Sequence, residues 1–283
     1  ERFILNADGS WTQYTYNALG QRSETLVVGQ PSFSDAELAA IRRGDATYPN
    51  QYPNRDLDEH LATRFDLANA RRTQVVYDAL GRAAYTLSLD DWNLQSVVTQ
   101  TRYDAAGRVS AEIHYAKRIL FSPNLTTAGV EALLQVAGAN AADQNRQTHY
   151  VYDGAGRLRY TLTETELTGS THAYAVTEQS YDKAGRVTET RVYRQVVALA
   201  QLDAASIQIA LAGQAVSVTT NEYDAAGRLE TVTDALLSKE RFQYNSAGSL
   251  VAYTNKEGHR WTYELDAAGR RVSEKIPQVV VSH

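Results

Sequence analysis

Carboxylates are the side chains in this sequence that come closest to a catalytic pattern. Three sets lie close together along the chain: Asp90 with Asp91, Glu164 with Glu166, and Asp56 with Asp58 and Glu59. Paired carboxylates can hydrolyse a glycosidic bond. On a strand, Glu164 and Glu166 would share one face, but Thr163 and Thr165 beside them are typical of a solvated sheet. We therefore interpret these carboxylates as exposed surface and predict no catalytic residue.

Metal ligands and other catalytic motifs are also poorly represented. Asn54, Asp56 and Asp58 have the spacing of a calcium loop, but the sixth position is not glycine, and Phe65 replaces the bidentate glutamate. The six histidines include no pair four residues apart, and cysteine is absent, which argues against a zinc site and excludes thiolate catalysis. No glycine-rich phosphate loop and no serine nucleophile elbow is present. We predict that the chain is not an enzyme and has no metal or cofactor.

The composition favours a globular structure rich in strands. The 283 residues carry a net charge of -5, and 43% of them are apolar, which is enough for one large or two ordinary domains. Lys and Arg form no cluster, so we exclude nucleic-acid binding. The apolar stretches are far shorter than the roughly 20 residues that insert into a membrane as a helix. Methionine is absent even at position 1, so we expect a fragment of a larger protein.

A six-residue motif, Tyr-Asp-x-x-Gly-Arg, is repeated along the chain. Complete copies begin at Tyr77, Tyr103, Tyr152, Tyr181 and Tyr223, and degenerate copies begin at Tyr16, Tyr244 and Leu265. Eight copies exclude chance, and we assign the motif a structural role. The residues assigned to it are Tyr16, Gly20, Tyr77, Asp78, Gly81, Arg82, Tyr103, Asp104, Gly107, Arg108, Tyr152, Asp153, Gly156, Arg157, Tyr181, Asp182, Gly185, Arg186, Tyr223, Asp224, Gly227, Arg228, Tyr244, Gly248, Asp266, Gly269 and Arg270.

Each copy contains the residues of a tight turn. Asp or Asn at the second position can accept a hydrogen bond from the backbone two residues later, and the glycine can adopt positive φ. This combination predicts a type I turn that is closed by a left-handed glycine and joins two strands of a hairpin. The motif tyrosine would be the last inward residue before the turn. The motif arginine would begin the return strand, where it could pair with the turn aspartate or lie on a neighbouring tyrosine ring.

The spacing of the copies predicts hairpins with helical insertions. The last three copies lie 21 residues apart, which fits two turns and two strands of typical length. Ser34 and Glu37 form a capping box in one of the longer spacings, and Val130 and Leu134 fall on one helical stripe in another. Helical insertions are predicted at about 33–44, 125–138 and 202–213, and a long loop at about 45–72.

These elements predict one architecture and leave one alternative. We expect residues 1–283 to form a single array of repeats with an all-β fold and small helical insertions. Its continuous antiparallel sheet of β-hairpins would curve or spiral as a segment of a shell. The alternative is a β-propeller, because two 21-residue units would make a four-stranded blade of about 42 residues.

The repeated motif resembles the YD-repeat family, also called Rhs repeats. The complete copies carry the resemblance, together with the preceding Gly-x-x-x-x-Tyr pattern at 258–263, and it extends nearly to the end of the chain. The family includes bacterial polymorphic toxins, the shell subunits of insecticidal Tc toxins and the teneurins of animals. The resemblance implies a sheet that spirals into a hollow shell, which in the toxin members holds a toxic polypeptide. The self-cleaving segment and C-terminal cargo of the family have no counterpart in this sequence.

The resemblance implies a structural function. The chain would be a wall segment of a large secreted or cell-surface bacterial protein that encloses or displays another polypeptide, such as a toxin. Its partners would be flanking repeats and a toxin cargo of the same polypeptide, and unpaired terminal strands favour edge-mediated self-association.

The alternative function is a glycan-binding adhesin module of a cell-surface protein. Aromatic rings on a sheet can stack on sugar rings, and the tryptophans Trp11, Trp92 and Trp261 are the candidate platforms. Rings that recur regularly in adjacent hairpins are expected to stack on one another instead. Trp92 lies outside this regular set and is therefore the candidate ligand-binding residue.

Overall fold

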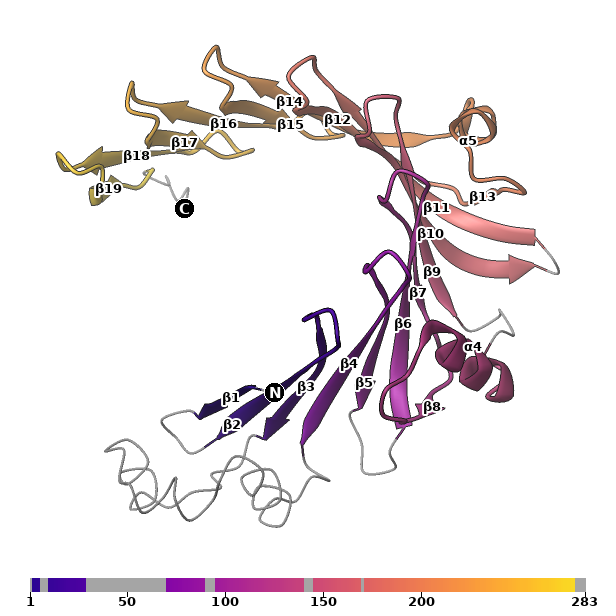
Figure 1. Cartoon of the computed structure of the whole chain (residues 1–283). Coiled ribbons are helices and arrows are strands. Elements are labelled where there is room, and N and C mark those ends of the chain that lie inside the picture. Colours follow the sequence, from indigo (N-terminus) through magenta and orange to yellow (C-terminus); the bar gives the residue numbers. More distant parts are fainter. Residues whose placement is uncertain are drawn as a thin grey trace, which may run out of the picture. The chain divides into compact units, whose positions relative to one another are not determined.

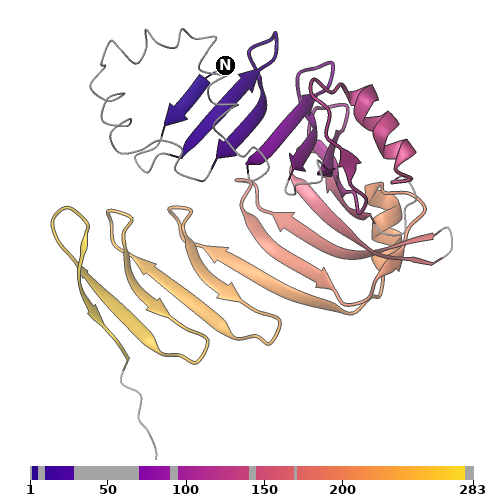
Figure 2. The ribbon, with the colours of Figure 1, turned by 90° about the horizontal axis from the view of Figure 1, so that it is seen from below.

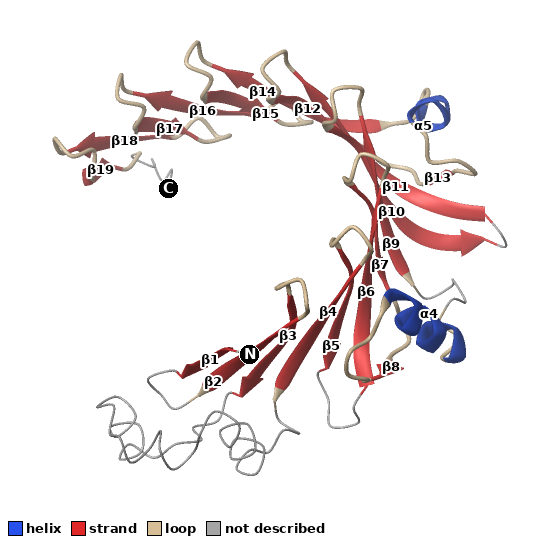
Figure 3. Cartoon of the chain, in the orientation of Figure 1, coloured by secondary structure: helices blue, strands red, loops and turns tan. Residues whose placement is uncertain are grey.

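The computed structural model describes residues 2–5, 10–28, 70–89, 95–139, 145–168 and 171–277. The chain divides into two compact units, Glu1–Gln147 and Thr148–His283, and each is described by itself. Among the described residues, both units consist mainly of antiparallel strands and contain one short helix (Figures 1 and 3).

In the first unit, consecutive strands pair in the order of the sequence. They are β1 (Arg2–Leu5), β2 (Trp11–Tyr16), β3 (Arg22–Val28), β4 (Arg71–Tyr77), β5 (Ala83–Leu89), β6 (Gln95–Tyr103) and β7 (Val109–His114). The short strand β8 (Ile119–Leu120) pairs with the N-terminal end of β6, on the same edge as β7 and opposite β5. Helix α4 (Thr127–Val136) follows β8.

The second unit repeats this scheme and extends it with plain hairpins. Its strands are β9 (Arg146–Tyr152), whose first two residues belong to the first unit, β10 (Leu158–Thr168), β11 (Thr171–Tyr181), β12 (Val187–Tyr193), β14 (Val216–Tyr223), β15 (Leu229–Thr233), β16 (Lys239–Tyr244), β17 (Leu250–Thr254), β18 (Arg260–Leu265) and β19 (Arg271–Lys275). The short strand β13 (Val197–Ala198) adds to β11 and precedes helix α5 (Ala204–Leu211). Figure 2 shows the hairpins from β14 to β19 lying side by side.

The sheet continues from hairpin to hairpin without separating into blades. Strands β14 to β19 pair one after another, with no break after four strands. The sheet is not closed, since β1 pairs with β2 alone and β19 pairs with β18 alone among the described strands. The predicted continuous antiparallel sheet of hairpins is therefore confirmed, and the propeller alternative is wrong.

A register shift accompanies every motif turn. In the copy at Tyr223, the tyrosine pairs with Leu229, and the regular register is interrupted between Glu222 and Tyr223. The corresponding irregularity occurs at the other seven copies. In the copy at Tyr223 the extra residue is Glu230 of the return strand, which is left without a partner and makes a β-bulge beside the turn.

Helix α4 packs on one face of the first unit with an apolar stripe. Val130 and Leu134 are fully buried and belong to one core cluster with Leu87 and Val98 of the sheet. Each buried side chain of this size contributes about 1.5–3 kcal/mol. The Thr126 hydroxyl caps the helix by accepting a backbone N–H in the first turn.

Helix α5 covers a face of the second unit in the same way. Ile207 and Leu211 pack in one core cluster with Leu162 and Val176 of the sheet, and the carboxylate of Asp203 caps the helix. The two helices lie within the predicted insertions at 125–138 and 202–213. The predicted insertion at 33–44 lies outside the described residues. Of the predicted loop at 45–72, only residues 70–72 are described, and the last two of these belong to β4.

Candidate functional site

The aspartate and the glycine of the motif together hold its turn. In the copy at Tyr77, Asp78 Oδ1 accepts the backbone N–H groups of Leu80 and Arg82, both at 2.9 Å. The Gly81 N–H donates to the Asp78 carbonyl at 3.0 Å. Gly81 has a φ of +76°, and this left-handed conformation costs other residues about 1–2 kcal/mol. The turn therefore needs a short polar side chain and a glycine at these two positions.

All eight copies form this turn. Each motif glycine has a φ between +75° and +88°. Asn17 and Asn245 replace aspartate in two degenerate copies, and their side-chain oxygens still accept the N–H of the residue four positions later, at 2.9 Å in both cases. The turn geometry therefore depends on a side-chain oxygen at this position and does not require its charge.

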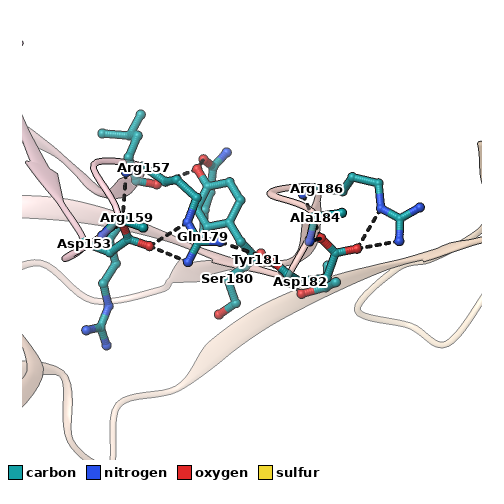
Figure 4. A network of polar contacts seen from close by, with 12 residues as sticks. Asp153, Arg157, Arg159, Gln179, Ser180, Tyr181, Asp182, Ala184 and Arg186 are labelled. Atoms are coloured by element: carbon teal, nitrogen blue, oxygen red, sulfur yellow. Dashed lines mark hydrogen bonds and ion pairs between the residues drawn. The ribbon is translucent and has the colours of Figure 1, made fainter. Parts of the chain in front are cut away.

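In each copy that contains both residues, the arginine binds the aspartate of its own turn. In Figure 4, Arg157 donates from Nε and Nη2 to Asp153 Oδ2 at 2.8 and 2.7 Å, and Arg186 does the same to Asp182 at 2.7 and 2.6 Å. The backbone N–H and the guanidinium of Arg157 lower the pKa of Asp153. The pKa is lowered in the same way, mainly by hydrogen bonds from the motif arginine, at Asp78, Asp104, Asp182, Asp224 and Asp266.

The same guanidinium also contacts the tyrosine of the next copy. The Cζ atom lies 4.4–4.7 Å from the ring centroid in the pairs Arg82–Tyr103, Arg157–Tyr181, Arg186–Tyr223 and Arg228–Tyr244. At this distance the cation is attracted to the face of the ring. The predicted alternatives for the arginine, pairing with the turn aspartate or lying on a tyrosine ring, are thus both realised by one side chain.

Hydrogen bonds strengthen this link between hairpins. Each of these tyrosines also donates a hydrogen bond from its hydroxyl to a backbone carbonyl of the hairpin before it, at 2.6–3.0 Å. The acceptor is the residue directly after the arginine that contacts the ring. The pairs are Tyr103 to Ala83, Tyr181 to Leu158, Tyr223 to Val187 and Tyr244 to Leu229. Arg157 and Arg228 also donate from Nη1 to a backbone carbonyl of the following turn, at 3.1 and 2.9 Å. We call this repeated series of Asp–Arg–Tyr contacts the motif ladder.

The first degenerate copy still contacts the next turn, whereas the last one lacks the arginine–tyrosine contact. Gln21 replaces the arginine of the first copy, and its Nε2 donates to the Gly81 carbonyl of the next turn at 2.8 Å. In the last copy, Leu265 replaces the tyrosine and Ser249 replaces the arginine before it. Arg270 still pairs with Asp266, but its side chain is 80% exposed, compared with 35% for Arg186. The contact from one hairpin to the next is therefore strongest in the complete copies.

Of the three carboxylate sets singled out in the sequence, the described residues include only Glu164 with Glu166. Glu164 was expected on an exposed face, but its side chain is 5% exposed and contacts His172. Asp56, Asp58, Asp90 and Trp92 lie outside the described residues, as do Glu59 and Asp91. Among the residues that are described, no group of three or more His, Asp or Glu side chains could hold a metal ion.

Two polar triads, each with a central side chain between two tyrosine hydroxyls, were not predicted from the sequence. Gln100 accepts from the Tyr115 hydroxyl at 2.9 Å and donates to the Tyr85 hydroxyl at 2.7 Å. In the second unit, Glu178 takes the place of Gln100 between Tyr160 and Tyr193. A comparison of copies could have found them, because Tyr85 and Tyr160 each follow a motif tyrosine by eight residues.

Glu178 remains charged in its buried position. It accepts from the Tyr193 hydroxyl at 2.8 Å and from Arg159 Nη2 at 3.2 Å. Burial acts to raise the pKa of Glu178, but hydrogen bonds from Tyr193, Tyr160 and Arg159 outweigh this effect and lower it. Burial and the nearby carboxylate raise the pKa of Tyr160 and of Tyr193 to about 12.

Aromatic side chains form a row across three strands of the second unit. The ring centroids of Phe242 and Tyr253 lie 5.3 Å apart, and those of Tyr253 and Trp261 lie 5.5 Å apart, with the planes tilted by 37° and 33°. These rings pack against one another. The row supports the expectation that regularly spaced rings stabilise the sheet, and it gives no support to glycan stacking on Trp261.

A family model and several solved structures match this chain. Residues 66–278 match the family model described as Teneurin YD-shell. No curated protein matches the chain. None of the described helices has the length and apolar character needed to cross a bilayer.

Several solved structures are similar over nearly the whole chain. One is TcdB2–TccC3–Cdc42, at 16% identity, covering 95% of this chain and 16% of that chain with a TM-score of 0.28. TcdB2–TccC3 without its hypervariable C-terminal region matches at 15% identity over 94% and 15%, with a TM-score of 0.28. The Photorhabdus luminescens Tc holotoxin pore matches at 13% identity over 94% and 15%, also with a TM-score of 0.28. The chain thus spans 15–16% of these larger chains. The family match covers most of the sequence, and the chain belongs to the Teneurin YD-shell family.

Proposed function

We propose that this chain is a wall segment of a large secreted or surface-exposed bacterial protein, and that the wall encloses or displays another polypeptide, such as a toxin. Membership of the YD-shell family supports a structural role. The partners are then the flanking repeats and a cargo carried by the same polypeptide. The proposal involves no catalysis and no cofactor.

The motif ladder is the observation that carries this proposal. Arg186 binds Asp182 of its own turn and lies 4.6 Å from the ring of Tyr223 in the next hairpin, and equivalent contacts recur in other copies. A wall must resist local opening, because one open hairpin would let a protease or the cargo through. Contacts between neighbouring repeats raise the free energy of such opening, as in other quasi-one-dimensional repeat proteins.

Limited proteolysis of the natural protein that contains this chain tests the proposal. The enclosed polypeptide should survive a protease concentration that digests the same polypeptide expressed alone. Cleavage at equal rates in the two samples would contradict enclosure. A matched variant that weakens the ladder, Tyr223→Leu, should restore cleavage of the enclosed polypeptide, whereas Leu265→Ala in the last copy should not.

A further inference from the structure

Each unit carries one helix, but a polar side chain ties only the first of these helices to its sheet. Glu131 of α4 accepts a hydrogen bond from the Tyr85 hydroxyl at 3.3 Å, and burial together with the charge of Glu131 raises the pKa of Tyr85. The matching position of α5, counted from the helix caps Thr126 and Asp203, is Gln208. Among the described residues, no side chain of α5 forms a hydrogen bond or an ion pair with a strand.

The corresponding acid of the second unit lies in the sheet itself. Tyr85 pairs with Gln100 in the first unit, as Tyr160 pairs with Glu178 in the second. Glu178 of β11 accepts from the hydroxyl of Tyr193 in β12 at 2.8 Å. The polar network of the second unit is therefore formed by strand residues, and α5 does not take part in it.

The C-terminal ends of the two helices differ in the same sense. Ala139, shortly after α4, is buried in the core cluster of the first unit, and its carbonyl accepts from Asn145 Nδ2 at 2.8 Å. The side chain of Asn145 also accepts the Ala116 N–H at 3.0 Å, which anchors this end to the chain after β7. Loops join α5 to β13 and β14 (Figure 3), and Gly213 in the second loop has a φ of +76° and no atom within 4 Å of an added Cβ. A glycine in open space can absorb a large change in backbone angles, so Gly213 is suited to act as a hinge.

Apolar contacts do not distinguish the two helices. The buried side chains of α4 are Val130 and Leu134, and those of α5 are Ile207 and Leu211. Each helix thus packs on its sheet with two buried apolar side chains. The polar tie and the anchored end of α4 are the contacts that α5 lacks.

We propose that α5 is a hinged cover, which lifts from the sheet of the second unit while the strands beneath it stay paired. Lifting separates Ile207 from Leu162 and Val176 and exposes an apolar face, but it breaks none of the hydrogen bonds around Glu178. Helix α4 lacks this freedom, because lifting it would also break its hydrogen bond with the Tyr85 hydroxyl. Such local opening is drawn from the least stable parts of a fold. The hinged cover does not depend on the proposed function of the wall.

Residue-resolved hydrogen exchange on the full chain tests the hinged cover. After correction for intrinsic exchange, the amides of residues 207–211 should exchange about tenfold faster, or more, than those of residues 176–178 in the strand beneath them. In the first unit, the amides of residues 130–134 should stay within about threefold of those of residues 98–100. Equal protection of 207–211 and 176–178, or faster exchange in α4 than in α5, would overturn the proposal.

Variants at matching helix positions assign the difference to the polar tie. Glu131→Ala should speed exchange of the α4 amides about fivefold or more, although alanine favours helix, because the bond to Tyr85 is lost. Gln208→Ala is the matched control and should not speed exchange of the α5 amides. Glu178→Gln, which copies the first unit, should speed exchange in β11 and leave the α5 amides unchanged. Unchanged α4 amides in Glu131→Ala, or faster α5 amides in Glu178→Gln, would overturn the proposal as well.

Discussion

At the residue scale, each motif arginine makes two kinds of contact with a single planar group. Arg186 donates two hydrogen bonds to Asp182 Oδ2 and places its Cζ 4.6 Å from the Tyr223 ring centroid. A lysine ammonium is a compact charge that cannot offer two parallel donors and a flat face at once. The motif therefore specifies arginine at this position and not merely a positive charge.

Replacing this arginine by lysine should separate the contribution of its shape from that of its charge. We expect Arg186→Lys to reduce the free energy of unfolding by about 1 kcal/mol, because the charge remains but the stacked and doubly bonded geometry is lost. Urea denaturation checks this value. Arg270→Lys is the matched control, since the Arg270 side chain is 80% exposed, and it should change stability by less than half as much. An equal loss in the two variants would show that the tyrosine ring contributes nothing.

The turn aspartates predict how the chain responds to acid. Their folded-state pKa values are lowered, so their contribution to stability is fully present above the unfolded-state pKa of about 4 and is lost as the pH falls through the lowered folded-state value. Asp182→Asn keeps the turn oxygen, as Asn17 and Asn245 do, but cannot titrate. Wild type should be the more stable protein at pH 7 in urea denaturation, and the difference should shrink as the pH falls below about 4. A difference that is independent of pH would exclude a role for the charge.

At the element scale, the same turn also occurs at the opposite ends of the hairpins. The N–H of Leu237 donates to the Asp234 carbonyl at 2.9 Å, and the N–H of Gly258 donates to the Asn255 carbonyl at 3.0 Å. Leu237 has a φ of +64° where Gly258 has +84°. A leucine in the left-handed region is strained, and its side chain is 80% exposed, so packing does not offset the strain.

Glycine at position 237 should therefore stabilise the hairpin β15–β16. We expect Leu237→Gly to raise the free energy of unfolding by about 1 kcal/mol through relief of the left-handed strain. Gly258→Ala is the reverse experiment, because no atom lies within 4 Å of the added Cβ, and it should destabilise by a similar amount. Thermal denaturation of both variants measures the two effects. If Leu237→Gly destabilises the chain, the exposed leucine has a contact or role that strain does not explain.

Elements that depend on nearby residues could be predicted from the sequence. Each motif turn is determined within five residues, such as Asp78 to Arg82, and the caps and apolar stripes of α4 and α5 are equally local. Contacts that depend on the register between paired strands could not be assigned from the sequence. The sequence allowed Arg82 to meet Asp78 or a tyrosine, but pairing of β5 with β6 brings Tyr103 to it.

The sequence pattern misassigned Glu164 and missed the position of the turn at Asp234 and the two triads, for similar physical reasons. Glu164 alternates with threonines and therefore has the pattern of an exposed strand, yet it shares its face of β10 with Tyr160 and Leu162, which are buried in the core cluster that includes helix α5. The turn at Asp234 lacks a glycine, which is the strongest signal for a left-handed position, so the spacing predicted a turn between Tyr223 and Tyr244 but not its position. Glu178 and Gln100 differ in charge, which conceals the equivalence of the two triads.

At the scale of the whole molecule, we expect an open strand edge to promote association. Among the described strands, β19 pairs with β18 alone, and an open edge is a template for another strand. Charged side chains such as Arg271 and Lys275 oppose this pairing but leave the backbone groups available. We expect the isolated chain to associate reversibly as its concentration rises, which sedimentation equilibrium would detect. A strictly monomeric species at the highest concentrations would contradict this expectation.

Hydrogen exchange in a Tyr223→Leu variant measures how strongly neighbouring hairpins are coupled by the motif ladder. Tyr223 belongs to one hairpin but contacts Arg186 and the Val187 carbonyl of the hairpin before it. Leucine is the residue that the last copy has at this position. Loss of the ring contact and the hydroxyl bond, each worth about 1 kcal/mol, should speed exchange of the Gly185 and Arg186 amides about tenfold or more. Exchange of these amides at the wild-type rate, with changes confined to the turn that follows Tyr223, would show that the hairpins are independent and that the ladder does not hold the wall together.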